Sequence, residues 1–295
     1  MMRRIAVLLS LAVCLAGCGR EPAEQEERAV KKQAGQEEKA AKNETNPEEK
    51  AVSAILKLGG VVDRDEKLPG RPVGRIVLAG TKATDSNLKG LKELKGLRWL
   101  DLTNTQITDA GLKDLKELKG LQSLNLRATQ ITDAGLKDLK ELEALKRLYL
   151  SHTQVTDAGL KDLKELKGLQ ALHLGNTHIT DAGLKNLKEL KGLQWLFLGS
   201  TKITDTGLKE LKELKGLQTL ELRSTKITDA GLKDLKELNH LYWLDLRDTK
   251  ITDAGLKDLK EFEALGSIDL SETHITDAGL KDLKQALPNT EIYGP

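Results

Sequence analysis

The stretch that decides the fold is LRWLDLTNTQITDAGLKDLKELKG, residues 97–120, because near-copies of it follow one another along most of the chain. Leu102 recurs as Leu126 and Thr105 as Thr129, and both columns continue at this fixed step as far as Leu270 and Thr273. An incomplete copy begins at residue 73, and a partial strand lies at residues 291–293. A fixed period of this length indicates stacked units, each of which packs mainly on its neighbours.

Each copy is predicted to hold one short strand and one helix. In residues 100–102 two leucines flank a polar residue, as on the buried side of a strand. The segment TDAGLKDLKELK begins with Thr108 and Asp109, which can cap a helix, and Gly120 follows its end. Leucines at every third position give this helix a buried side, while its charged residues face water. We expect the ninth residue, Thr105, to hydrogen-bond backbone groups between successive turns.

The unit LxxLxLxxTxITDAGLKDLKELKG resembles the leucine-rich repeat, whose period is 20–29 residues. The ITDAGL phrase and the threonine at the ninth position are similar to a bacterial branch related to the ribonuclease-inhibitor-like and F-box-associated repeats. The resemblance covers residues 73–295, about three quarters of the chain. It implies an α/β solenoid, a curved horseshoe with parallel strands on the concave face, helices on the convex face and an N-terminal helical cap. It also implies protein binding, because leucine-rich repeats usually bind proteins.

The start of the chain, 1–17, is predicted to be an export signal. Two arginines precede an apolar run over residues 5–16, which is too short to span a bilayer but suits a signal-peptide core. The run ends in LAGC and resembles the lipobox of bacterial lipoproteins, whose cysteine is acylated. That resemblance implies lipidation at Cys18 and a chain anchored to a bacterial membrane, on its periplasmic or cell-surface side. The alternative is an ordinary signal peptide with an incidental cysteine.

Two further segments precede the repeats. Residues 18–46 are predicted to form a disordered charged tether, since they hold no Leu, Ile or aromatic residue from which to build a core. Residues 47–72 are predicted to hold a capping helix and a connector. Asn46 can cap this helix, and Pro47 suits its first position. Residues 73–295 are the predicted repeat domain.

The composition excludes several classes of function. The chain has 47 basic and 45 acidic residues, a net charge of +2, so it lacks the basic field that nucleic-acid binding needs. Both cysteines, Cys14 and Cys18, precede the repeats, which therefore have neither a disulfide framework nor a cysteine metal site. The five histidines are scattered and form no metal cluster or triad. We expect no cofactor, no metal and a monomeric chain.

Variation between copies is concentrated at the third, fifth and seventh positions, whose side chains are predicted to point into the concave groove. Six of the eight aromatic residues of the chain fall in these rows. Large aromatic and charged side chains gathered on one face can anchor a partner. The residues predicted to bind a partner are Trp99, Arg147, Tyr149, His173, Trp195, Phe197, Glu221, Trp243 and Asp245.

The aromatic residues have two interpretations. Strands about 4.8 Å apart would bring Tyr149, His173 and Phe197 into an adjacent ladder, with Trp195 beside it. Clustered, exposed aromatic side chains mark an interaction site. Alternatively, these side chains stack along the sheet and stabilise it. Stacking accounts well for Tyr149 and Phe197 but less well for three tryptophans on one face.

The acidic residues of the groove also have more than one interpretation. Glu221, Asp245 and Asp269 are predicted to lie on consecutive strands, where like charges destabilise a sheet. They either pair with Arg223 and Arg247 in the next row or recognise a basic partner. A calcium site is a third interpretation, and it requires six to eight oxygen ligands.

The sequence predicts a non-enzymatic protein-interaction scaffold in the bacterial cell envelope, which binds a protein or peptide through the concave strand face. A glycan is the alternative ligand, since aromatic faces pack against sugar rings. Glu221 and Asp245 also suggest glycoside hydrolysis by a retaining pair about 5–5.5 Å apart, but the open groove offers no water-excluding cleft. The F-box-associated relatives serve ubiquitin ligases. We do not carry that role over, because the export signal predicts a location outside the cytosol.

Overall fold

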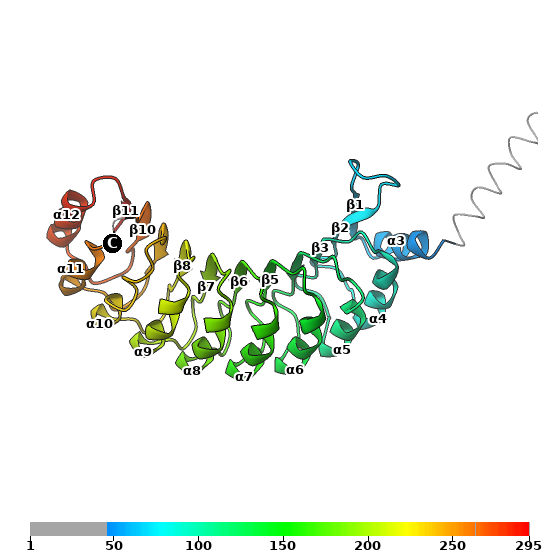
Figure 1. Cartoon of the computed structure of the whole chain (residues 1–295), viewed down its shortest axis with the longest axis horizontal. Helices are drawn as coiled ribbons and strands as arrows, with labels where there is room; N and C mark the ends of the chain where they lie inside the picture. Colours follow the sequence, from blue (N-terminus) through cyan, green and yellow to red (C-terminus); the bar gives the residue numbers. More distant parts are fainter. Residues whose placement is uncertain (1–45, 263, 295) are drawn as a thin grey trace, which may run out of the picture. The chain divides into compact units, whose positions relative to one another are not determined.

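The computed structural model describes residues 46–262 and 264–294. The predicted export signal, Cys18 and the tether as far as residue 45 lie outside the described residues. The chain divides into two units, residues 1–50 and residues 51–295. The second unit is a curved solenoid, with strands along the inner side of the curve and helices along the outer side (Figure 1). The predicted fold class is therefore confirmed.

The strands of the described residues form one eleven-stranded sheet in chain order. β1 pairs antiparallel with β2, and each later pair is parallel, with equivalent positions of neighbouring repeats as partners. β1 lies within the predicted connector, where no strand was expected. The strands are β1 Val61–Arg64, β2 Val73–Val77, β3 Trp99–Asp101, β4 Ser123–Asn125, β5 Arg147–Tyr149, β6 Ala171–His173, β7 Trp195–Phe197, β8 Thr219–Glu221, β9 Trp243–Asp245, β10 Ser267–Asp269 and β11 Glu291–Tyr293.

The first helical turn of most repeats is α-helical and the next is a 3-10 helix, so the prediction of one continuous helix was wrong. The spacing of the leucines explains this, because a helix with three residues per turn keeps all of them on one side. The α-helices are α4 Asp85–Leu88, α5 Asp109–Leu112, α6 Asp133–Leu136, α7 Asp157–Leu160, α8 Asp181–Leu184, α9 Asp205–Leu208, α10 Asp229–Leu232, α11 Leu256–Leu259 and α12 Asp277–Ala286; the 3-10 helices are η2 Lys89–Glu93, η3 Lys113–Leu115, η4 Lys137–Glu141, η5 Lys161–Glu165, η6 Lys185–Glu189, η7 Lys209–Glu213 and η8 Asp253–Gly255.

A helix does lie where the capping helix was predicted, as α3, Pro47–Lys57. In the first unit, the Glu48 backbone N–H donates to Asn46 Oδ1 at 3.0 Å, so Asn46 caps the helix as expected. In the second unit, Ala51, Val52 and Ile55 of the same helix are buried in the core that the leucines of the repeats continue. The leucines of the strands and helices in the middle repeats are almost wholly buried, at 0–2% exposure.

Neighbouring repeats are joined at the start of each helix by a carboxylate, at a junction that we call the seam. Asp109 Oδ1 accepts a hydrogen bond from the Thr132 backbone N–H at 2.9 Å, and Asp109 Oδ2 accepts one from Thr132 Oγ1 at 2.6 Å. The same pair of bonds recurs along the array. The seam pairs are Asp85–Thr108, Asp109–Thr132, Asp133–Thr156, Asp157–Thr180, Asp181–Thr204, Asp205–Thr228, Asp229–Thr252 and Asp253–Thr276.

The glycine of each TDAG phrase leaves room for this carboxylate. A Cβ added at Gly135 would lie 2.4 Å from Asp109 Oδ1, closer than van der Waals contact permits. Thr132 also caps its own helix, because its Oγ1 accepts a hydrogen bond from the Ala134 N–H at 3.2 Å. One short phrase therefore supplies the cap, the carboxylate and the space for the carboxylate of the preceding repeat.

The ninth-position threonines do hydrogen-bond backbone, but within their own repeat. Thr105 Oγ1 donates to the Leu102 carbonyl at 2.6 Å, and Thr129 Oγ1 donates likewise to the Leu126 carbonyl. The prediction of a bond between successive turns was therefore wrong for this column. The link between repeats belongs instead to the aspartate of the seam, which the sequence had suggested only as a helix cap.

Candidate functional site

The concave sheet carries the residues that differ most from repeat to repeat. Parallel pairing aligns Trp99 with Ser123, Ser123 with Arg147, and so on along the third position, while the leucine between the rows points into the core. The row of third positions reads Arg75, Trp99, Ser123, Arg147, Ala171, Trp195, Thr219, Trp243 and Ser267; the row of fifth positions reads Val77, Asp101, Asn125, Tyr149, His173, Phe197, Glu221, Asp245 and Asp269.

Three of the predicted residues form a continuous ring stack on neighbouring strands. The Tyr149 and His173 ring centroids are 4.4 Å apart with planes at 27°, and those of His173 and Phe197 are 3.9 Å apart at 9°. Burial lowers the pKa of His173 to about 4, because the charged imidazolium loses its hydration there. Both faces of the His173 ring are covered, so this stack stabilises the sheet in the way the second interpretation expected.

The three tryptophans are half-buried on the row of third positions. Trp99 lies between two arginines, with the guanidinium carbons of Arg75 and Arg147 each 5.7 Å from its ring centroid. Trp195 neighbours Ala171, which is only 4% exposed, and Thr219. All three tryptophan side chains keep part of their surface open to a partner.

The acidic residues on β8 and β9 are buried and paired, as one of their interpretations predicted. Asp245 has 0% exposure, and its carboxylate accepts hydrogen bonds from Arg247, the shortest being 2.7 Å from Nη2. Glu221 pairs with Arg223 and accepts a further bond from the Gly199 N–H at 3.3 Å. The Asp245 side chain has no surface for a partner to touch, so it can influence binding only through Arg247.

Arginines of the concave sheet differ in pairing: Arg75 pairs with Asp63 at the N-terminal end and Arg223 and Arg247 pair in the C-terminal half, whereas Arg127 and Arg147 pair with no described residue. In the C-terminal half, Arg247 also bridges to Asp269, with its Nε 3.3 Å from Oδ2. In the N-terminal half, Arg127 and Arg147 are exposed and form no ion pair among the described residues. Within the described part of the chain, no group of three or more His, Cys, Asp or Glu side chains is placed to hold a metal ion.

A hollow of about 220 Å³ opens beside the ring stack, because two neighbouring residues in the row of seventh positions are glycines, which have no side chain. Gly175 and Gly199 stand on neighbouring strands of this row, and His173 and Phe197 form one wall. Arg127 and Arg223 line it as well. The sequence indicated this space through the two glycines.

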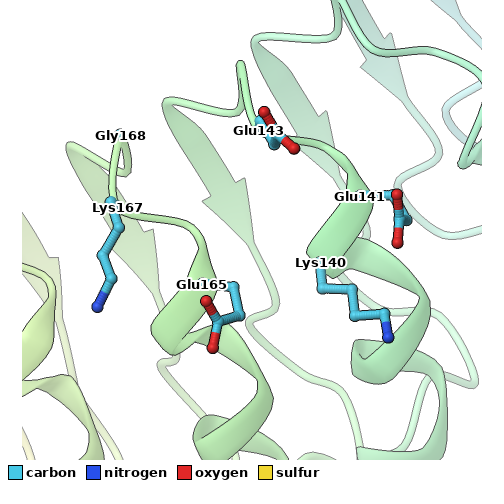
Figure 2. Close-up of a pocket in the computed structure, with 6 residues that line it drawn as sticks. All are labelled: Lys140, Glu141, Glu143, Glu165, Lys167 and Gly168. Atoms are coloured by element: carbon cyan, nitrogen blue, oxygen red, sulfur yellow. The ribbon is translucent and has the colours of Figure 1, made fainter.

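A second, shallower hollow of about 660 Å³ lies between repeats near the ends of the 3-10 helices, away from the predicted residues. Figure 2 shows Lys140 and Glu165 coming from neighbouring helices, and Glu143 from the turn that follows the first. In four other repeats this turn carries a lysine that pairs with a glutamate of the next repeat, as Lys191 Nζ does with Glu213 Oε2 at 3.0 Å. Glu143 stands in the place of that lysine, so the ion pair to the next repeat is missing at Glu165, which lines the same hollow.

Comparison with known families identifies the array. A family model described as leucine-rich repeat region matches residues 75–229, and a leucine-rich repeat model matches residues 237–260. The chain is a leucine-rich repeat protein. Leucine-rich repeat domains with this fold are generally non-enzymatic scaffolds for protein interaction.

Solved structures of bacterial leucine-rich repeat proteins have similar folds. Internalin C2 of Listeria monocytogenes has 30% sequence identity and a TM-score of 0.51, over 68% of this chain and 80% of that one. Another Listeria monocytogenes internalin has 20% identity and a TM-score of 0.45, over 82% and 93%. A leucine-rich repeat protein of Leptospira interrogans has 21% identity and a TM-score of 0.44, over 69% and 62%. The comparison with curated proteins found no match.

Proposed function

We propose that this leucine-rich repeat protein is a non-enzymatic scaffold, anchored by lipid in a bacterial cell envelope, that binds a protein partner through the concave strand face. The observation that carries the proposal is the row of half-buried tryptophans, Trp99, Trp195 and Trp243. Side chains at the seam and in the core hold neighbouring repeats together, so they are not available to bind a partner. Partly exposed tryptophans on the variable face are the residue type that dominates binding energy at interfaces.

A protein partner fits this face better than a glycan. Sugar rings pack on the faces of aromatic side chains, and the faces of the His173 ring are covered by Tyr149 and Phe197. Arg75 and Arg147 lie over the Trp99 ring, so glycan binding would have to rely mainly on Trp195 and Trp243. Hydrolysis by Glu221 and Asp245 has no support either, since arginines already hold both carboxylates.

Intrinsic tryptophan emission tests the binding face. Residues 46–295 would be titrated separately with envelope protein extract and with envelope glycans. A saturable shift with the protein fraction supports the proposal, and a shift with the glycan fraction alone supports the alternative ligand. Trp195→Ala should then weaken binding by about 2 kcal/mol or more.

A matched control is Tyr242→Ala, because Tyr242 is 62% exposed but lies outside the three rows. We expect this variant to bind as the unaltered protein does. Equal losses from Trp195→Ala and Tyr242→Ala would contradict the placement of the site on the concave face.

The envelope anchor is proposed from the resemblance of residues 15–18 to a lipobox, and the monomeric state from the sequence expectation. The described helices are all too short or too polar to cross a bilayer. Two or three acyl chains at Cys18 would hold the protein firmly, at about 0.8 kcal/mol per buried CH₂. Labelling cells with a radioactive fatty acid should mark the protein and should not mark Cys18→Ser. Equal labelling of both would contradict lipidation at this cysteine.

A further inference from the structure

Two polar atoms without partners lie on neighbouring strands in the N-terminal half of the concave sheet. Trp99 Nε1 and Ser123 Oγ are both buried and have no hydrogen-bond partner among the described residues. Ser123 is 1% exposed and lies on the strand between Trp99 and Arg147. Buried polar groups in proteins are nearly always hydrogen-bonded, so two such atoms on paired residues indicate that a partner is missing.

The charged groups around these two atoms indicate that the missing partner carries negative charge. The Arg75 and Arg147 guanidinium groups flank the Trp99 ring at 5.7 Å each. Asp63 pairs with Arg75 at 3.1 Å, but Arg147 forms no ion pair with any described residue. Trp99 Nε1 can only donate a hydrogen bond, and a guanidinium also only donates. An acceptor with negative charge would satisfy all of these groups together.

Among residues 46–262 and 264–294, the buried, unpartnered ring nitrogen and the flanking arginines are specific to Trp99, because the other two tryptophans have neither. Trp195 and Trp243 occupy the same position in their repeats, yet neither ring nitrogen is both buried and unpartnered within the described part of the chain. No arginine ring contact is present at either of them among the described residues. The feature therefore does not come from the repeat itself.

We propose that Arg147, Trp99 and Ser123 form a binding site for a carboxylate presented by an acidic segment of a protein partner. Arg147 is exposed, and it lies on the strand next to Ser123. When a carboxylate accepts from the planar guanidinium, Arg147 leaves the Trp99 ring and opens access to Ser123 Oγ and Trp99 Nε1. The inference rests on the protein-binding function proposed above, and it names the chemistry of the partner.

An extended acidic segment fits the surroundings better than a small free anion. The site lies on an open sheet face and not in an enclosed cavity. The exposed Arg127 lies on the same half of the sheet, at the seventh position of its repeat, also without an ion pair among the described residues. A chain with several carboxylates can engage both arginines, and complementary charge of this kind orients a partner as it docks.

The test uses the full chain in detergent and hexaglutamate as the probe, with hexaglutamine as its uncharged match. Calorimetric titration should show saturable binding of hexaglutamate only. Arg147→Gln should weaken it about tenfold, and Ser123→Ala about threefold or more. Lys113→Gln, which removes an exposed cation on the convex helical side, is the matched control and should change the affinity by less than twofold. Equal binding of the two peptides, or an unchanged affinity in Arg147→Gln, would overturn the proposal.

Ser123→Ala separates binding from folding. It removes a hydroxyl that has no partner among the described residues, so its thermal unfolding midpoint should stay the same or rise. A lower midpoint together with weaker binding would assign Ser123 a structural role and overturn its place in the site. Emission from Trp99 alone, in a chain with Trp195→Phe and Trp243→Phe, should change on adding hexaglutamate, and a constant emission would place the peptide elsewhere.

Inorganic phosphate distinguishes the source of the anion. Binding of phosphate without binding of hexaglutamate would overturn the assignment to an acidic protein segment. The inference and the proposed function also fail separately. If hexaglutamate does not bind but a protein partner binds more weakly to Trp195→Ala, only the inference about the acidic segment is overturned. If a protein partner binds equally well to Trp195→Ala and to Arg147→Gln, the proposed function of the concave face is overturned.

Discussion

The seam between repeats and the concave sheet use the same repeat unit in opposite ways. At the seam, each carboxylate from Asp85 to Asp253 makes the same two hydrogen bonds to the next repeat. On the concave sheet, successive strands present tryptophan, serine, arginine and alanine at one position. The difference shows that uniform residues stack the array, while the concave rows vary in side-chain size and charge from strand to strand and can provide a binding surface.

Two features cross this division, because they lie on the concave sheet but hold the structure together. They are the Arg247 pairs with Asp245 and Asp269, and the ring stack centred on His173. Variants at these positions and at the seam show how far the division holds.

The largest effect is expected from Arg247→Ala. It leaves the Asp245 carboxylate, which has 0% exposure, without its guanidinium partner. The Arg247 side chain is itself 41% exposed, so we expect the lower end of the cost of breaking a buried pair, about 3 kcal/mol of unfolding free energy, which urea denaturation would measure. Arg127→Ala is the control from the exposed set and should change that free energy by less than about 0.5 kcal/mol. Similar losses from both would contradict a structural role specific to Arg247.

The seam itself should be sensitive to a single methyl group. A Cβ at Gly159 would lie 2.5 Å from Asp133 Oδ1, which the Thr156 N–H holds at 2.7 Å, and 3.1 Å from the Asp133 Cα. We expect Gly159→Ala to lower the free energy of unfolding by about 2 kcal/mol through overpacking. At Gly120 the nearest atoms to an added Cβ are 3.9 Å away, so Gly120→Ala should be nearly neutral in the same urea titration.

The ring stack should give stability a pH dependence. Burial lowers the folded-state pKa of His173 from 6.5 to about 4, so the neutral form is favoured in the folded protein. The resulting stabilisation is fully present above pH 6.5 and is lost as the pH falls from 6.5 to about 4. Because the ring remains partly exposed, we expect a loss of about 1–2 kcal/mol.

His173→Phe keeps a ring in the stack but cannot titrate, so the slope of unfolding free energy over this pH range should become flatter. His240→Gln is the control, since His240 is exposed. A slope that His173→Phe leaves unchanged would show that other groups cause the pH dependence.

The smallest effect concerns the missing ion pair in Figure 2. Glu143→Lys would place a lysine opposite Glu165, as Lys191 lies opposite Glu213 in a repeat that has the pair. Exposed pairs contribute little, so we expect the midpoint of thermal unfolding to rise by only about 1–2 °C in a calorimetric scan. Glu143→Gln removes the like charge without creating a pair, and its midpoint should rise less. A larger rise in Glu143→Gln would show that repulsion, and not pairing, dominates there.

The repeat architecture was predictable because every unit imposes the same local pattern. The recurring leucines, spaced for a strand and then for a helical side, leave one arrangement in which all of them are buried. The parallel register follows from the constant period, and it brings Tyr149, His173 and Phe197 together as predicted. Helix type was predicted wrongly, although the leucines recur at every third position, which is the period of a 3-10 helix.

By itself, then, the sequence determined the leucine-rich array and the rows of the concave sheet, and it offered Arg223 and Arg247 as one of three explanations for Glu221 and Asp245, which the structure then selected. Only the tertiary structure decided that Asp109 bonds to the next repeat while Thr105 stays within its own, since several donors and acceptors lie within reach of each along the chain. It also decided that Ser123 and Trp99 bury polar atoms without described partners beside Arg147. Those properties depend on side-chain rotamers and on the packing of side chains from three strands. Neither the rotamers nor the packing can be inferred from the period of the repeat.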